Sequence, residues 1–168
     1  MQIYLIGFMG AGKSYLGRKL ADYWQQDFYD LDLLLAAKYQ RSVGEIFREK
    51  GEAGFRREES KLLLAWQKPG IIACGGGVIE LEVNREYLKQ QTVIWLDAKW
   101  PILWQRIKAS ARPLVLELGE SGAKKLYEKR KDLYRSCTDS IIQSSEQTAA
   151  NLEMLSREMH LICASEKV

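Results

Sequence analysis

A glycine-rich stretch near the start of the chain carries residue types that bind phosphate. Residues 7–14 read Gly-Phe-Met-Gly-Ala-Gly-Lys-Ser, which matches the Walker A pattern in full. The glycines let the backbone curl and point N–H groups at phosphate oxygens, and the helix expected next adds the positive end of its dipole. The Lys13 ammonium suits the β- and γ-phosphates, and the Ser14 hydroxyl suits Mg²⁺. The motif predicts binding of ATP with Mg²⁺ and leaves the phosphate acceptor open.

Two aspartates end the second expected strand, residues 28–32. Because strand side chains alternate, Asp30 and Asp32 are expected on one face at the carboxyl edge of the sheet, where ligands bind. One carboxylate could then serve the hydrated Mg²⁺ and the other an acceptor hydroxyl. Alternatively, Asp32 only caps the helix expected from Leu33. The residues alone leave both interpretations open.

Three consecutive glycines and several cations complete the candidate chemistry. Residues 75–77 follow the third expected strand, where glycines allow close approach of a ligand and offer N–H donors. Arg56 lies early in one expected helix and Arg130 late in another, while Arg112 either reaches over bound phosphates or is simply exposed. Most charges in such runs are solvated. A surface position is expected for Arg57, Lys129 and Lys131.

Strands that alternate with helices must position these residues, and this alternation predicts a parallel sheet covered on both faces. Ser42 followed by Glu45 is a capping box for a helix from Val43. Residues 109–122 hold one proline and two glycines and are expected to form a loop. No linker divides the chain, so one domain over residues 1–168 is expected. Strands are expected at 3–6, 28–32, 71–74, 92–96 and 140–143, and helices at 13–25, 33–40, 43–50, 53–67, 101–108, 123–135 and 148–161.

Composition limits the classes of partner and compartment. The 168 residues are 46% hydrophobic and 28% charged, with a formal net charge of +3. So mild a charge does not by itself argue for nucleic acid or membrane as a partner. The three cysteines form no CxxC pair and are expected to be reduced thiols. No basic leader precedes an apolar segment and no apolar run approaches a membrane span, so the cytoplasm is the expected compartment.

The ordered set of motifs resembles the shikimate kinase family over nearly the whole chain. Gluconate and nucleoside monophosphate kinases share the first motif but not the set. The resemblance implies an α/β fold: a three-layer α/β/α P-loop domain with a five-stranded parallel sheet in the order 2-3-1-4-5 and a lid at about 109–122. The resemblance rests on the phosphate loop, Asp30-Leu31-Asp32, Phe55-Arg56 with Glu59, Gly75–Gly77, Arg112-Pro113-Leu114, and Arg130 with Leu133-Tyr134.

The resemblance further implies transfer of the γ-phosphoryl group of ATP to the 3-hydroxyl of shikimate in aromatic amino-acid biosynthesis. The cofactor would be Mg²⁺, held by Ser14 directly and by Asp30 through water. A monomer with no nucleic acid or membrane partner is expected. The implied catalytic residues are Asp32, Lys13 and Arg112; the implied ATP-binding residues are Gly10, Ala11, Gly12, Lys13, Ser14, Tyr15, Arg112 and Gln147; and the implied shikimate-binding residues are Asp32, Arg56, Gly75, Gly76, Gly77 and Arg130.

The chain departs from the family pattern at a few positions. Tyr15 stands where a small Ser or Thr usually follows the loop serine, Asp132 replaces a proline, and Ser136 replaces a glutamate. The segment between Arg106 and Arg112 is slightly short for a lid. Two other functions therefore stay open: a kinase for another small hydroxy-acid or sugar acid, and a non-catalytic nucleotide-binding regulator.

Overall fold

A five-stranded parallel sheet forms the centre of the protein. The computed structural model describes residues 1–110, 112–145 and 147–165. Every neighbouring pair of strands is parallel, and the strands, numbered along the chain, lie in the order 2-3-1-4-5, which confirms the predicted topology. The central strands are apolar without alternation because helices bury both faces. The strands are β1 (Gln2–Ile6), β2 (Phe28–Asp30), β3 (Gly70–Ala73), β4 (Thr92–Ala98) and β5 (Ser140–Ser144).

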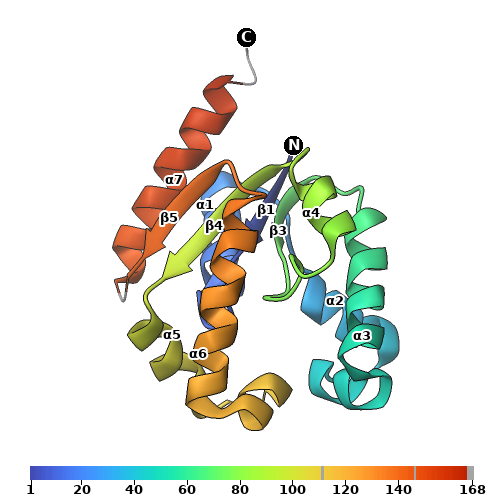
Figure 1. Ribbon diagram of the computed structural model, residues 1–168. Coiled ribbons are helices and arrows are strands. Elements are labelled where there is room, and N and C mark those ends of the chain that lie inside the picture. Colours follow the sequence, from blue (N-terminus) through green and yellow to red (C-terminus); the bar gives the residue numbers. More distant parts are fainter. Residues whose placement is uncertain (111, 146, 166–168) are drawn as a thin grey trace.

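Helices cover the sheet on both faces and make the predicted three layers. Figure 1 shows α6 (Pro113–Arg135) crossing the sheet in front, with α1 (Lys13–Trp24) behind it. Among the described residues, none of the helices combines the length and the apolar character that a membrane span needs. The remaining helices are α2 (Leu31–Tyr39), α3 (Val43–Leu64), α4 (Glu82–Leu88), α5 (Trp100–Ile107) and α7 (Thr148–Ser165).

Aromatic contacts seat α6 on the sheet. The ring of Tyr134 stacks on Trp95 of β4 with centroids 5.6 Å apart, and Tyr127 meets Phe8 edge-on at 5.4 Å. All four rings are buried. Such pairs add to the free energy gained by burying apolar area. The result is a fixed position for α6 above the end of β1, where the phosphate loop begins.

The prediction of a loop at residues 109–122 is wrong for most of this segment, which is helical. Helix α6 already begins at Pro113, and residue 111 lies outside the described residues. Proline is tolerated in the first helical turn because the N–H it lacks would have no partner there. Gly119 adopts φ 60 and ψ −169, so the helix kinks and then continues. A similar kink at Gly51 (φ 65) joins the two helices expected at 43–50 and 53–67 into α3.

The second strand is shorter than predicted. It ends at Asp30, and the next residue, Leu31, already begins α2. Asp30 is the N-cap: its carboxylate accepts hydrogen bonds from the backbone N–H groups of Asp32 at 3.0 Å and Leu33 at 3.2 Å. The expectation that both aspartates end the strand is therefore wrong, and so is the alternative that Asp32 caps the helix. A capping carboxylate satisfies N–H groups that the first helical turn leaves free, which ends the strand early.

Candidate active site

The phosphate loop joins the carboxyl end of β1 to the start of α1. Gly10 and Gly12 adopt φ values of 83 and 97, which side chains rarely tolerate. Space is also short, because a Cβ built on Gly10 would lie 2.8 Å from a side-chain carbon of Ile107. The loop therefore needs glycine at both positions for backbone conformation, and at Gly10 for packing as well.

Lys13 fills the inside of this loop. Its ammonium is buried and donates hydrogen bonds to the carbonyls of Gly7 at 2.8 Å and Phe8 at 3.2 Å. Burial lowers the pKa of Lys13, and the negative charge of Asp32 opposes that effect. Ser14, one residue later, is exposed at the first turn of α1. The two residues thus present a cation inside the loop and a hydroxyl at its rim.

A central cavity of about 520 Å³ lies beside the loop. Of the implied shikimate-binding residues, every one lines it, and so does Arg112. Five buried side-chain polar atoms in the described part of the chain have no hydrogen-bond partner, and four of them belong to residues that line this cavity. Unpaired buried polar atoms are costly, so the cavity is built for a polar ligand. The four atoms are Arg56 Nε, Glu59 Oε1, Ser110 Oγ and Arg130 Nη2.

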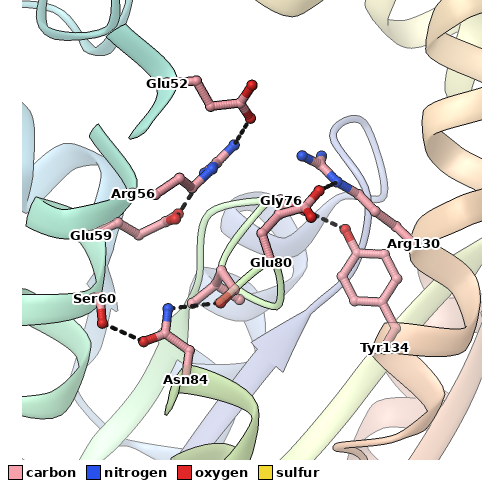
Figure 2. Close-up of polar contacts among 10 residues, drawn as sticks. Glu52, Arg56, Glu59, Ser60, Gly76, Glu80, Asn84, Arg130 and Tyr134 are labelled. Carbon is pink, nitrogen blue, oxygen red and sulfur yellow. Dashed lines mark hydrogen bonds and ion pairs between the residues drawn. The ribbon is translucent and has the colours of Figure 1, made fainter. Parts of the chain in front are cut away.

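Arg56 reaches the cavity from α3. Its guanidinium is buried, donates to Glu59 at 2.8 Å and forms a longer ion pair of 3.5 Å with Glu52 (Figure 2). Burial raises the pKa of Glu59, and the positive charge of Arg56 opposes that rise. The Arg56–Glu59 pair is one helical turn apart, so a single face of α3 supplies both groups.

Arg130 reaches the same cavity from α6, on the opposite side (Figure 2). It is 1% exposed, and its Nε donates to the carboxylate of Glu80 at 2.7 Å. One turn further along α6, the Tyr134 hydroxyl donates to the carbonyl of Gly76. Helix α6 is thereby tied at two points to the segment that follows β3.

The glycine triplet forms the floor between the two arginines. A Cβ on Gly75 would lie 2.1 Å from Glu59 Oε1, and one on Gly77 would lie 2.1 Å from Cζ of Arg56. Gly76 is less restricted, since its Cβ would lie 3.1 Å from a backbone nitrogen of the phosphate loop. Close approach of these charged groups to the backbone explains why the floor lacks side chains.

Asp32 lies between the phosphate loop and the arginines. Burial and the neighbouring Asp30 carboxylate raise the pKa of Asp32. The charges of Lys13, Arg56 and Arg112 act in the opposite direction. Oδ1 of Asp32 would be 2.8 Å from a Cβ on Gly75, so the carboxylate meets the cavity floor. The site thus brings a carboxylate and two buried guanidinium groups to one cavity.

The structure places the remaining predicted residues at the edge of the site. Arg112 is exposed at the N-cap of α6, and Tyr15 is 55% exposed on α1. An outer pocket of about 280 Å³ on the other side of the loop is lined by Gly12, Tyr15, Leu16, Arg106, Thr148 and Asn151. Gln147 precedes α7 and is exposed, and it lines neither this outer pocket nor the central cavity.

Two residues of the site, Glu80 and Arg106, were not predicted from the sequence. Glu80 pairs with Arg130, and Arg106 donates to the carbonyl of Gly10 at 3.0 Å and to that of Ser145 at 3.2 Å. The sequence signal for Glu80 was its place three residues after the glycine triplet, where a carboxylate is close to a suspected ligand site. Arg106 stood in an ordinary amphipathic helix and had no distinguishing neighbour.

Comparison with known proteins agrees with this geometry. The family model for shikimate kinase matches residues 9–160. A shikimate kinase of Alkaliphilus oremlandii is 41% identical over 153 residues, or 87% of this chain and 90% of that protein. One of Lactococcus lactis is 39% identical over 88% of this chain and 91% of that protein. A bifunctional shikimate kinase/3-dehydroquinate synthase of Thermotoga maritima is 38% identical, and this chain spans 27% of its length.

Solved structures give the same result. A shikimate kinase from Acinetobacter baumannii in complex with shikimate has a TM-score of 0.88 and 33% identity, covering 98% of this chain and 93% of that one. A deoxyadenosine kinase from M. mycoides, with a TM-score of 0.63 and 15% identity, shares the fold alone. Family model, curated relatives and fold agree over nearly the full length, so the chain belongs to the shikimate kinase family.

Proposed function

We propose that this chain uses ATP to phosphorylate the 3-hydroxyl of shikimate. The observation that carries the proposal is the pair of buried arginines that face one cavity beside a complete phosphate loop. A planar guanidinium matches a carboxylate with two parallel hydrogen bonds, so two of them select an acid over a neutral sugar. Within the described part of the chain, Nη2 of Arg130 and Nε of Arg56 have no hydrogen-bond partner, and a bound carboxylate or its neighbouring hydroxyls would supply one.

Asp32 is proposed to bind and orient the acceptor hydroxyl. Burial raises its pKa, which makes its carboxylate a better proton acceptor than that of an ordinary aspartate. Phosphoryl transfer has a loose transition state, so positioning and charge neutralisation matter more than early deprotonation. Lys13 would exchange its two loop carbonyls for phosphate oxygens as the nucleotide binds.

Arg112 is proposed to close over the phosphates as part of a lid. It is close enough to lower the pKa of both Lys13 and Asp32, and it is exposed at the N-cap of α6. A guanidinium there neutralises charge on the transferring group, and a closed lid excludes water.

Mg²⁺ is proposed to be held by Ser14 directly and by Asp30 through water. The donors fit the ion, because Mg²⁺ prefers oxygen ligands and keeps several of its waters. The exposed Ser14 hydroxyl stands at the loop rim, and Oδ1 of Asp30 caps α2, which leaves the other carboxylate oxygen for a water. When bound, the ion neutralises phosphate charge.

The adenosine part of ATP is proposed to occupy the outer pocket. Gly10, Ala11 and Gly12 would surround the phosphates, and Tyr15 would form one wall of that pocket. Gln147 is proposed to contact adenine from the start of α7. Arg106, which also lines the pocket, fixes the loop through the carbonyl of Gly10.

The chain is further proposed to act as one domain, a monomer with small-molecule substrates and no nucleic acid or membrane partner, in the cytoplasm. The buried free thiols of Cys74 and Cys137 support a reducing compartment. Light scattering of the purified chain measures the oligomeric state, and a dimeric mass contradicts the monomer.

An ADP-release assay with varied acceptors tests the function. Shikimate should support ADP formation with Mg²⁺, whereas a neutral cyclic polyol of similar size should not, and phosphorus NMR should place the ester on the 3-hydroxyl. A stronger response to another hydroxy-acid would favour the rival kinase. ATP binding without acceptor-dependent ADP would favour a regulatory protein.

A further inference from the structure

Glu80 takes no part in phosphoryl transfer as proposed, yet it pairs with a cavity arginine. We infer that Glu80 is a positioning residue for substrate recognition. Its carboxylate holds Arg130 by Nε, so that the Nη edge of the guanidinium faces the cavity and binds the carboxylate of the acceptor. This inference rests on the proposed function, since it assumes that the acceptor is an acid.

The turn that carries Glu80 is held firmly. The N–H of Glu80 donates to the carbonyl of Gly77 at 3.0 Å, which closes the turn after the glycine triplet. Arg85 of α4 donates to the carbonyls of Ile79 at 2.7 Å and Glu80 at 3.0 Å. Asn84 donates to a third carbonyl of the same turn at 2.8 Å. These bonds hold the backbone that carries Glu80, so its side chain reaches Arg130 from a fixed point.

The Arg130 guanidinium needs such a partner. It is 1% exposed, its Cζ lies 5.8 Å from the ring centroid of Phe8, and Nη2 has no hydrogen-bond partner among the described residues. The Nε bond to Glu80 leaves the Nη1–Nη2 fork available for a bidentate carboxylate. If the bond to Glu80 were lost, the contact with the Phe8 ring would still restrain the plane of the Arg130 guanidinium. It would not fix the rotation of the guanidinium within that plane.

Anchoring of α6 does not depend on Glu80 alone. One helical turn from Arg130, the Tyr134 hydroxyl donates to the carbonyl of Gly76 (Figure 2). The Tyr134 ring also stacks on Trp95. A variant that loses the Glu80–Arg130 bond therefore keeps the helix seated. The effect of Glu80 should appear in recognition of the acid rather than in the position of α6.

Steady-state kinetics of Glu80→Ala test this inference. Losing a hydrogen bond to a charged group should raise KM for shikimate roughly tenfold, with KM for ATP unchanged and kcat within about twofold. Glu80→Gln keeps an acceptor oxygen and should recover most of the loss. Glu80→Asp keeps the charge but withdraws it by one methylene, so KM for shikimate should rise in a variant of unchanged net charge.

Glu86→Ala is the matched control, because Glu86 lies on α4 and pairs only with exposed Lys89 at 2.8 Å among the described residues. It should leave all three constants unchanged. An unchanged or lower KM for shikimate in both Glu80→Ala and Glu80→Asp overturns the inference, as does a parallel rise in KM for ATP. If the wild type binds shikimate by calorimetry but releases no ADP, the proposed function fails, and the dissociation constants of the same variants decide the inference separately.

Discussion

Replacing Gly77 by alanine tests whether recognition of the acid depends on the observed position of the Arg56 guanidinium. A Cβ at position 77 would lie 2.1 Å from Cζ and 2.2 Å from Nη2 of Arg56. A normal carbon–carbon contact is about 3.5 Å, so the guanidinium must retreat by about 1.4 Å, the difference between 3.5 and 2.1. It cannot do so and keep both its 2.8 Å bond to Glu59 and its place over the cavity.

The expected magnitude follows from that displacement. A hydrogen bond to a charged group contributes about 1.5–3 kcal/mol, so misplacing Arg56 should raise KM for shikimate about 10- to 100-fold. Overpacking a well-filled site costs about 1–3 kcal/mol of unfolding free energy, which lowers Tm by roughly 2–10 °C in a chain of this size. KM for ATP should not change, because the three atoms nearest to the new methyl group all belong to Arg56 and none to the phosphate loop.

A coupled ADP assay with shikimate varied at saturating ATP measures these constants. Gly75→Ala is the informative companion, because its Cβ would lie 2.8 Å from Asp32 Oδ1 as well as 2.1 Å from Glu59. It should lower kcat in addition to raising KM for shikimate. Wild-type KM for shikimate in Gly77→Ala, at a wild-type Tm, would refute the reasoning.

Three further predictions follow from groups described above. Asp32→Asn should keep ATP binding and lower kcat by about 10²- to 10⁴-fold. Because burial raises the pKa of Asp32 above its ordinary value of 3.8, its carboxylate is lost as pH falls through that raised value, so kcat/KM should drop on the acid side earlier than for an unperturbed aspartate, and this limb should be absent in Asp32→Asn. Chelation of Mg²⁺ should abolish ADP release, and Ser14→Ala should raise the Mg²⁺ concentration needed for half-maximal rate; an unchanged requirement contradicts the metal role. Ser42→Ala removes the capping box in which Ser42 Oγ accepts from the N–H of Glu45 at 3.2 Å, so thermal unfolding should show a loss of about 1 kcal/mol and a Tm lower by roughly 2–4 °C.

Local sequence signals predicted most of the fold but failed where tertiary packing decided. Short β-rich runs predicted all five strands. The central strands are apolar throughout because helices bury both their faces, whereas β2 and β5 are only partly buried. Helix α4 was missed, since it has seven residues and Leu81 at its N-cap offers no side-chain hydrogen bond. Pro113 and Gly119 indicated a loop, whereas proline fits a first turn and the glycine only kinks α6.

The site divides in the same way. The glycines were identifiable by their type and spacing, and Arg56 and Arg130 through the resemblance of the whole motif set to shikimate kinases. The structure lines one cavity with Gly75–Gly77 and these two arginines. Glu80 and Arg106 were not, because their partners lie 50 and 96 residues away in sequence. The end of the second strand was predicted two residues too late, at Asp32 instead of Asp30, because capping of α2 by Asp30 competes with strand pairing.

The central cavity takes its walls from segments that are far apart in the chain, around residues 32, 56, 75–77 and 130, whereas the phosphate loop is one continuous run. Local opening of any one of these segments therefore removes the acid site. A ligand in the cavity is bound only by the complete tertiary structure, and it stabilises all of those segments together by mass action. Acceptor binding thus reports complete folding, because only a chain whose distant segments have all assembled can bind the acceptor.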